Sequence, residues 1–273
     1  MVSNYVNSDL DEIIRSVLSE PTDHVLVQNP NVKILGSIVE VASERQGELP
    51  NLQVLADSGV VKEVMDDFMI GSESADLIDQ GDLFIRTHDE DENEGHSLCV
   101  LDDSVYSLIT TKGEKVALAS DDESFVEGIH SICSSEWGSA EEFSMRTPPI
   151  TRVRETLEED IGAEVLADFT AMLESVDSLR GDEIDEVLIA LLAAANNDVL
   201  LYDISKWGED VGLASKATFS RTKSLLGNNG IITTEKVPID VGRPRLRLQL
   251  TESFDDVDVE EMVSVARDMI LQA

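Results

Sequence analysis

Hydrophobic residues in the first 80 positions recur at two spacings, one typical of helices and one of strands. Intervals of three and four residues predict a helix over residues 4–18, with an apolar side made of Leu10, Ile13, Ile14, Val17 and Leu18. The same spacing predicts helices near residues 32–43, 60–68 and 73–80. Short apolar runs at residues 24–28 and 52–56 predict strands. Alternating strands and helices are typical of an α/β layer.

From Gly81 the apolar period changes to that of strands. Four strands are predicted, at residues 82–87, 97–101, 104–110 and 115–120. The polar loop 88–95 and the turn at 112–113 lie between them, so we expect three hairpin connections in a mixed or antiparallel part of the same sheet. A helix over residues 124–133 would close over that sheet. Together these elements predict one α/β domain over residues 1–147.

The pair Pro148-Pro149 interrupts this pattern and places the domain boundary between residues 144 and 151. The second domain, residues 152–273, begins with a long helix that starts near 155 or 161 and ends near 175, followed by a helix at 182–195. A terminal helix over 255–271 carries the apolar stripe Val259, Met262, Val263, Ala266 and Ile270. This stripe must be buried against the helix at 161–176, either within the chain or across a two-fold axis. We favour a homodimer.

Residues 204–250 have the order of a winged helix-turn-helix. Ile204, Trp207 and Val211 predict a short helix that ends at Gly212, and Ser215 would cap a second helix over 216–227. The inward side of that second helix is predicted to hold Phe219, Thr222, Leu225 and Leu226. Strands at 231–237 and 245–250 follow, joined by a turn that contains Gly242-Arg243-Pro244. In the second strand leucines alternate with Arg245, Arg247 and Gln249, so one face would pack and the other would present guanidinium groups.

The charge of the chain reverses in this stretch. Residues 213–250 hold seven basic and two acidic side chains, whereas the remaining 235 residues hold 13 basic and 54 acidic ones. A positive segment in a chain of net charge −36 favours a nucleic-acid partner over a solvated surface of mixed charge.

The acidic residues are scattered through periodic segments, and 42% of the residues are hydrophobic, so we expect a folded, soluble chain. Such a surface is typical of extreme halophiles, in which molar salt screens charges over about 3 Å. Phosphate contacts weaken in molar salt, so DNA binding would need base contacts, dimer avidity or bound cations as well. The absence of a long apolar run or a signal peptide, together with only two cysteines, Cys99 and Cys133, indicates a cytoplasmic protein without a membrane partner.

Catalytic motifs are missing. None of the four histidines begins the His-x-Lys triplet of a phospholipase D type site, and no phosphate-binding loop or nucleophile elbow occurs. His88, His96, Cys99 and Asp102 match no zinc spacing. The paired carboxylates are more simply explained as surface in a chain with 56 acidic residues. We therefore expect no catalysis, no cofactor and no metal, with a hydrolase site in residues 1–145 as the least favoured alternative.

Three loops of the first domain could hold a small molecule. The crevice of an α/β sheet lies outside the strand ends, and the loops there offer amides, hydroxyls and helix N-termini suited to a sugar or a phosphorylated metabolite. The alternative is that these are ordinary strand-to-helix loops. The candidate ligand-binding residues are Asn29, Asn31, Asp57, Ser58 and Ser124.

The acidic composition, the α/β first half and the winged helix together resemble the haloarchaeal TbsP-type transcriptional regulators, which act beside TrmB-family regulators on genes of sugar metabolism. The most similar stretches are Gly162–Phe169 (GAEVLADF) and residues 204–232, and the order of elements matches over nearly the whole length. The resemblance implies a cytoplasmic DNA-binding regulator of gluconeogenic or glycolytic genes. It also implies that residues 1–147 are a degenerate relative of the phospholipase D-like fold that senses an effector, in agreement with the missing His-x-Lys triplet.

Our first hypothesis is a homodimeric transcription factor that binds double-stranded DNA through residues 216–227 in the major groove. Ser220 and Arg221 would lie near base edges, and the arginines of the hairpin would lie on phosphates or in the minor groove. The alternative is an adaptor whose winged helix binds a protein. The predicted DNA-binding residues are Ser215, Lys216, Thr218, Ser220, Arg221, Lys223, Ser224, Arg243, Arg245 and Arg247.

Overall fold

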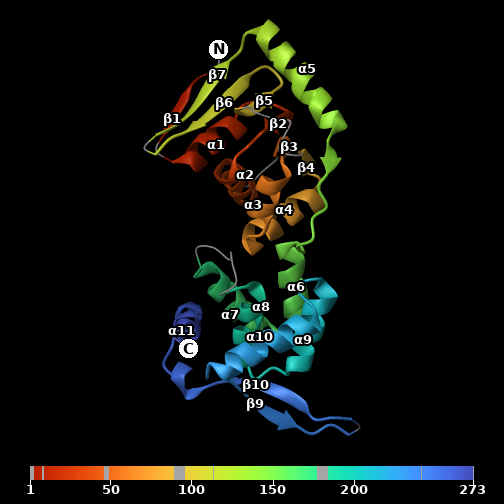
Figure 1. The fold of residues 1–273 in the computed structure, drawn as a ribbon, viewed down its shortest axis with the longest axis vertical. Helices are drawn as coiled ribbons and strands as arrows, with labels where there is room; N and C mark the ends of the chain where they lie inside the picture. Colours follow the sequence, from red (N-terminus) through yellow and green to blue (C-terminus); the bar gives the residue numbers. More distant parts are fainter. Residues whose placement is uncertain are drawn as a thin grey trace. The chain divides into compact units, whose positions relative to one another are not determined.

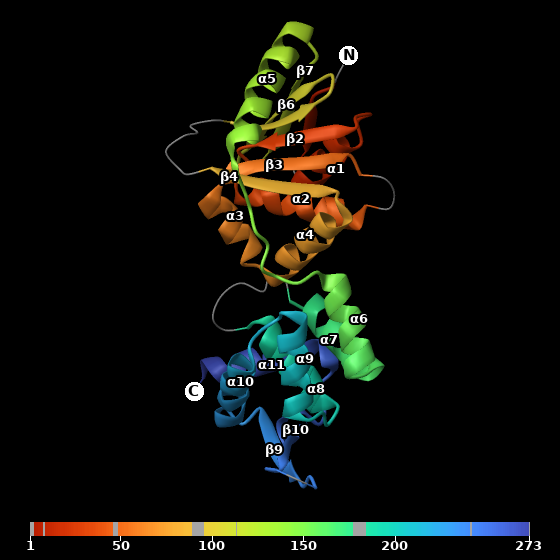
Figure 2. The ribbon, with the colours of Figure 1, turned by 90° about the vertical axis from the view of Figure 1, so that its right-hand side faces the viewer.

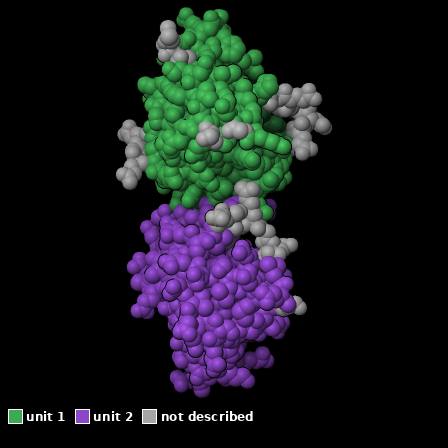
Figure 3. All heavy atoms as spheres, turned by 90° about the vertical axis from the view of Figure 1, so that its left-hand side faces the viewer, with its two compact units in different colours: residues 1–66, 70–145 green, residues 67–69, 146–273 purple. Residues whose placement is uncertain are grey.

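The computed structural model divides the chain into two compact units, residues 1–66 with 70–145 and residues 67–69 with 146–273 (Figures 1 and 3). The structure describes residues 3–7, 9–45, 49–88, 96–112, 114–176, 184–240 and 242–272. Most of the predicted loop 88–95, the turn residue at 113 and the first two residues of the predicted helix 182–195 lie outside this part. No described helix is both long and apolar enough to cross a membrane.

A mixed β-sheet forms the centre of the first unit. Its strands lie in the order β1-β7-β6-β5-β2-β3-β4-β8; β2, β3 and β4 are parallel neighbours, and the remaining pairings are antiparallel. The elements of the first half are β1 (Tyr5–Asn7), α1 (Leu10–Leu18), β2 (His24–Gln28), α2 (Val32–Glu44), β3 (Asn51–Asp57), α3 (Ser58–Met65), α4 (Phe68–Gln80), β4 (Leu83–His88), β5 (Ser97–Leu101), β6 (Val105–Thr110), β7 (Lys115–Ser120), α5 (Glu123–Ser139) and β8 (Glu141–Glu142).

Each face of this sheet has its own apolar core (Figure 2). Helices α1 to α4 cover one face, where alternate strand residues such as Val25, Val27 and Val54 are fully buried. Helix α5 lies over the other face, against Leu26, Val100 and Val105. The period of two along each strand thus separates the two cores, and the predicted closing helix is confirmed, although it extends from residue 123 to 139.

Two predictions for this unit are wrong. Residues 5–7 form an edge strand paired with β7, so the first helix begins only at Leu10, where Asp9 caps it. Strands β4 and β5 are also not a hairpin, because β2 and β3 lie between them in the sheet. The other two predicted hairpins, β5–β6 and β6–β7, are present.

Both cysteines are free and buried. Cys99 belongs to the core between the sheet and helices α1 to α4, and Cys133 belongs to the core between the sheet and α5. The two thiols therefore lie on opposite faces of the sheet. Burial raises the pKa of Cys99 to about 12 and the pKa of Cys133 to about 11, so both stay protonated and unreactive at neutral pH.

The second unit is mainly helical, with a β-hairpin. Its elements are α6 (Ile150–Asp160), α7 (Ala163–Glu174), α8 (Glu186–Asn196), α9 (Leu201–Val211), α10 (Lys216–Asn228), β9 (Ile232–Val237), β10 (Arg245–Leu250), the short 3-10 turn η2 (Glu252–Phe254) and α11 (Val259–Leu271). Helix α8 is the centre of the core, since every residue from Val187 to Ala195 is buried. The other helices and the hairpin pack around it.

The flanking helices agree with the prediction in part. Of the two starts predicted for the first helix, the one near 161 is confirmed by α7, and the one near 155 is wrong, because Gly162 takes a φ of 141°, a conformation that favours glycine, and separates α6 from α7. The terminal helix begins at Val259 and its stripe, centred on Met262, Val263 and Ala266, is buried against α7 and α8 of the same chain. The stripe therefore gives no support to a dimer.

Candidate nucleic-acid interface and ligand pocket

A tight turn joins α9 to α10. Gly212 ends α9 in the left-handed conformation, with φ of 90°, and the backbone N–H groups of Leu213 and Ala214 donate to the carbonyl of Gly208. Ser215 then begins α10, because its Oγ accepts a hydrogen bond from the backbone N–H of Thr218 at 3.2 Å. The predicted glycine stop and serine cap are both confirmed.

The two helices approach each other closely at Gly208. A Cβ built on this residue would lie 2.3 Å from two ring carbons of Phe219, which is fully buried. Only a residue without a side chain allows this approach, so Gly208 sets the position of α10 on α9.

Behind this pair, Trp207 fixes α9 to the core. Its ring is 2% exposed and meets Phe169 edge to face, with centroids 6.4 Å apart. Its Nε1–H donates to Oγ1 of Thr156 on α6 at 3.0 Å, which satisfies the buried indole donor. The predicted core role of Trp207 is confirmed. Its contacts anchor α9, and α9 in turn supports α10.

The outward face of α10 is polar and almost free of carboxylates. Ser220, Arg221 and Ser224 are exposed on it, and so is Ala217, which the sequence did not single out. Arg221 donates from Nη2 to Oγ1 of Thr218 at 3.3 Å, a contact along its own helix that leaves most of the guanidinium available.

The exposure of two further side chains of α10 adds to this description. Leu225 is 41% exposed, so the prediction that it faces inward is wrong. Lys223 is half-buried at the side of the helix. Of the predicted inward residues, Phe219 and Leu226 are the buried ones.

The hairpin packs on the unit as a wing. Strands β9 and β10 pair antiparallel, with Leu248 opposite Thr234. The backbone N–H of Leu248 donates to Val199 at 2.9 Å, and an isolated bridge joins Leu200 to Arg247, so β10 is also tied to the chain segment before α9. Leu248 is fully buried, as predicted for the packed face.

Carboxylates neutralise three of the basic side chains in residues 213–250. Arg245 Nη1 lies 3.2 Å from Asp203 Oδ1, and Arg247 Nη1 lies 3.4 Å from Glu235 Oε2. Lys216 is hydrogen-bonded to Glu209, which lowers the pKa of Glu209 and raises that of Lys216. The face of β10 that was predicted to present guanidinium groups is thus largely ion-paired. The basic side chains that form no ion pair with a described residue are Arg221, Lys223, Lys236 and Arg243.

A hollow of about 450 Å³ lies between α9, α10 and the wing. Four of the predicted DNA-binding residues line it together, namely Lys216 and Ser220 from α10 and Arg243 and Arg245 from the hairpin. Residues that the sequence did not indicate line it too, above all Tyr202, whose ring lies 3.9 Å from the Arg245 guanidinium carbon, and Ile239. Tyr202 is 45% exposed at the start of α9. Its contact with Arg245 could not be predicted from the sequence, because the two residues are 43 positions apart and belong to different elements.

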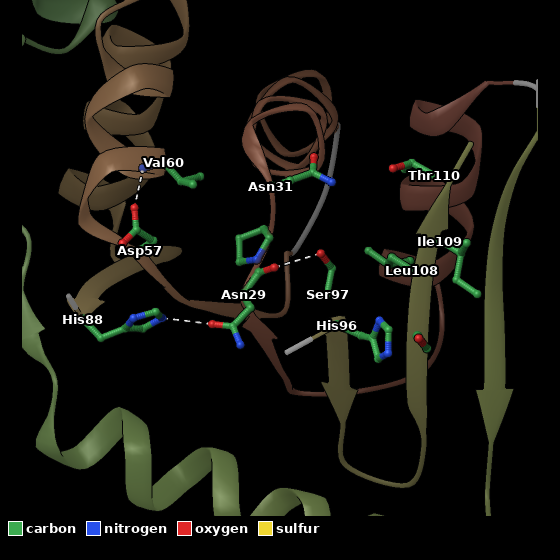
Figure 4. Close-up of a pocket in the computed structure, with 12 residues that line it drawn as sticks. Asn29, Asn31, Asp57, Val60, His88, His96, Ser97, Leu108, Ile109 and Thr110 are labelled. Atoms are coloured by element: carbon green, nitrogen blue, oxygen red, sulfur yellow. Dashed lines mark hydrogen bonds between the residues drawn. The ribbon is translucent and has the colours of Figure 1, made fainter. Parts of the chain in front are cut away.

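A second hollow, of about 580 Å³, lies in the first unit where β2, β3, β4 and β6 end and β5 begins (Figure 4). Asn29, Asn31 and Asp57, which the sequence predicted, line it together with His88, His96 and Ser97. Val60 lies beside Asp57, and Leu108 and Ile109 of β6 lie on the other side of the hollow (Figure 4).

Asn29 is held firmly in this hollow. Its φ of 49° is left-handed, which Asn tolerates better than most residues. Its N–H donates to Leu55, its carbonyl accepts from Ser97 Oγ at 2.8 Å, and its Oδ1 lies 2.9 Å from His88 Nε2 (Figure 4). Contacts to β3 and β5 thus fix the backbone of Asn29, and the contact to His88 of β4 fixes its side chain.

The remaining candidates lie elsewhere. Ser58 follows Asp57 as the first residue of α3 but does not line the hollow. Ser124 follows the end of β7, which runs antiparallel to β6, so it lies at the opposite edge of the sheet and its Oγ donates to Asp122. The structure therefore contradicts the grouping of Ser124 with Asn29 and Asp57. Within the described part of the chain, no three His, Cys, Asp or Glu side chains are grouped as metal ligands would be.

Comparison with known proteins supplies the family. The model for the N-terminal domain of TbsP-like transcriptional regulators matches residues 2–148, and the model for their C-terminal helix-turn-helix domain matches residues 149–267. No curated protein matched.

Two solved structures show only a distant likeness. TrmBL2, described as an archaeal chromatin protein with a novel mode of DNA binding, is 13% identical over 52% of this chain and 55% of its own, with a TM-score of 0.35. This chain thus spans about half the length of TrmBL2. NucT from Helicobacter pylori is 14% identical over 52% of this chain and 99% of its own, with a TM-score of 0.33. Scores this low carry no argument about function.

The two family matches together span nearly the whole chain, and the second of them coincides with the turn, the capped helix and the wing described above. The chain belongs to the family of TbsP-like transcriptional regulators.

Proposed function

We propose that the protein is a sequence-specific DNA-binding regulator that places α10 in the major groove and the β9–β10 wing on the adjacent backbone. The observation that carries this proposal is the hollow lined jointly by Lys216, Ser220, Arg243 and Arg245, next to the polar outward face of α10. A helix that presents hydroxyls and a guanidinium beside a basic hairpin matches the docking geometry of winged helices.

The side chains divide by role. Ser220, Arg221 and Ser224 lie on the exposed face and would contact base edges, with the Ala217 methyl available to a thymine methyl. Lys216, Lys223 and Arg243 would contact phosphates, and Ser215 and Thr218 fix the first turn of α10. Of these, Lys216 would reach a phosphate only by releasing Glu209, and Arg245 and Arg247 would likewise have to release Asp203 and Glu235.

The first unit is proposed to sense an effector without catalysis, through the hollow at the ends of β2 and β3. The family resemblance supports control of sugar or central carbon genes in the cytoplasm of a halophilic archaeon, and the net charge of −36 supports the halophilic setting. A relation of this unit to the phospholipase D-like fold stays a prediction. A homodimer also stays a prediction, supported by the paired half-sites that helix-turn-helix proteins commonly read.

The test is a binding experiment with the full-length protein. Genomic fragments are incubated with protein and excess competitor DNA, separated by electrophoretic shift and sequenced. We expect a defined subset of fragments to be retained. Arg221→Ala should weaken binding to them by roughly 1–3 kcal/mol and relax the sequence preference.

The matched control is Arg267→Ala, which removes the same charge from an exposed position on α11 and should leave affinity unchanged. If no fragment is retained over competitor at either low or molar salt, the regulator proposal fails and a protein-binding role for the winged helix becomes the better explanation.

A further inference from the structure

We infer that the hollow at the ends of β2, β3 and β6 binds a neutral polyhydroxylated ligand, such as a sugar or polyol, and discriminates against its phosphate esters. This inference rests on the proposed role of the first unit as an effector-binding module. A volume of about 580 Å³ is within the range of small-molecule sites.

The groups that would bind a phosphate are already occupied. Helix N-termini bind anions through free backbone N–H groups, but both helices that begin at this hollow are capped by their own side chains. Asn31 Oδ1 accepts from the N–H groups of Lys33 and Ile34. Asp57 Oδ1 accepts from those of Gly59 and Val60, and the bond to Val60 is drawn in Figure 4. An incoming phosphate would have to displace these caps.

The charge at the hollow is also unfavourable to an anion. Among the described residues that line it there is no Lys or Arg, and Lys33, two positions after Asn31, is therefore not one of them. Asp57 contributes a carboxylate instead. A phosphate ester would therefore meet a like charge from Asp57, and the described lining offers it only the histidines His88 and His96 and no lysine or arginine.

The polar side chains that line the hollow are suited to bind the hydroxyl groups of a ligand. The second carboxylate oxygen of Asp57 is buried and accepts no hydrogen bond from any described residue. The side chains of Asn29 and Asn31 offer amide donors, and Ser107 and Thr110 offer hydroxyls from the opposite wall.

That wall also carries apolar surface from Leu108, whose side chain points toward the hollow, whereas that of Ile109, the next residue of β6, points away (Figure 4). A sugar or polyol has hydroxyl groups for the polar side and C–H surface for Leu108. The two kinds of wall therefore match the two kinds of surface on one neutral ligand.

The test compares matched pairs of ligands on the full-length protein by titration calorimetry, in a fixed high-salt buffer. The probes are glucose with glucose 6-phosphate and glycerol with glycerol 3-phosphate, and spermidine serves as a cationic probe. We expect the neutral member of at least one pair to bind at least tenfold tighter than its phosphate ester and than spermidine.

Two variants assign the effect to the hollow. Asp57→Asn keeps a capping oxygen but removes the charge, and should shrink the preference over the phosphate ester at least fivefold. Asn29→Gly keeps the left-handed backbone while removing the amide, and should lower neutral-ligand affinity at least tenfold. Ser124→Ala, at the opposite edge of the sheet, should change nothing.

Tighter binding of a phosphate ester or of spermidine, or no binding by any probe, would overturn the inference. DNA retention by the unliganded protein is measured in parallel. If the protein retains DNA but binds no probe, only the ligand assignment is refuted. If the protein retains no DNA, the proposed function is refuted whatever the result with the ligands.

Discussion

Gly208 permits the close contact between α9 and α10, on which the proposed DNA-reading geometry depends, so Gly208→Ala tests that geometry directly. The new Cβ would lie 2.3 Å from Cε2 and Cζ of Phe219, about 1.1 Å inside the 3.4 Å at which ordinary contact begins. The Phe219 ring is fully buried and cannot swing away into solvent. Helix α10 must therefore shift outward from α9, or the ring must leave its rotamer.

The size of the effect follows from two opposing terms. Overpacking of a core costs typically about 1–3 kcal/mol, and a 1.1 Å overlap with a fully buried ring belongs at the upper end. Alanine in place of a helical glycine returns up to about 1 kcal/mol. We expect a net loss of about 2 kcal/mol, which lowers the melting temperature of a unit of this size by roughly 6–10 °C.

The assay is equilibrium unfolding followed by the fluorescence of Trp207 in a Trp137→Phe background, which leaves one tryptophan, located in the second unit. The matched control is Gly227→Ala in α10, where the nearest atom to the new Cβ is 3.9 Å away. That variant should be neutral or about 0.5–1 kcal/mol more stable. Equal or greater stability of Gly208→Ala would refute the proposed close contact.

Other predictions concern the interface itself. Ser215→Ala removes the cap of α10 and should cost about 1 kcal/mol of unfolding free energy, measured by urea denaturation, while Ser215→Asn should restore most of it. Arg243→Gln should flatten the plot of log K against log salt by about 0.9, the contribution of one phosphate contact. Arg247→Gln, in the same hairpin, should flatten it less, because Glu235 already neutralises that guanidinium; equal slopes would show that the ion pair opens at no cost. Glu209→Gln should steepen the plot by freeing Lys216.

The sequence predicted those features whose cause is local. The apolar periods located β2, α2 and α10, and the turn chemistry of Gly212 and Ser215 located the helix-turn-helix. Strand β1 was missed because Tyr5–Asn7 is a strand only through its pairing with β7, some 110 positions later. A segment of three residues is too short to show the alternation of apolar and polar side chains from which a strand is predicted.

The two sites were predictable to different degrees. Asn29, Asn31 and Asp57 follow parallel strands, so the strand-end rule found them. His88 joins them because β4 pairs with β3, and Ser97 and Thr110 join them only because β5 pairs with β2 and β6 with β5, an order that the sequence does not reveal.

At the DNA interface the basic residues were visible in the sequence but their partners were not. Asp203 and Glu209 lie outside the basic segment, and the fold of α9 brings them to Arg245 and Lys216. The charge count of residues 213–250 therefore overstates the positive charge at this surface.

These ion pairs bear on how so acidic a protein would discriminate between DNA sequences. A phosphate that binds Lys216, Arg245 or Arg247 must compete with Glu209, Asp203 or Glu235, so contacts to the backbone gain less free energy than free cations would give. Base contacts from Ser220, Arg221 and Ser224 have no such competitor among the described ion pairs. Non-specific affinity is then lowered more than specific affinity. In molar salt, where screening over about 3 Å already weakens phosphate contacts, we expect discrimination to depend mainly on the outward face of α10.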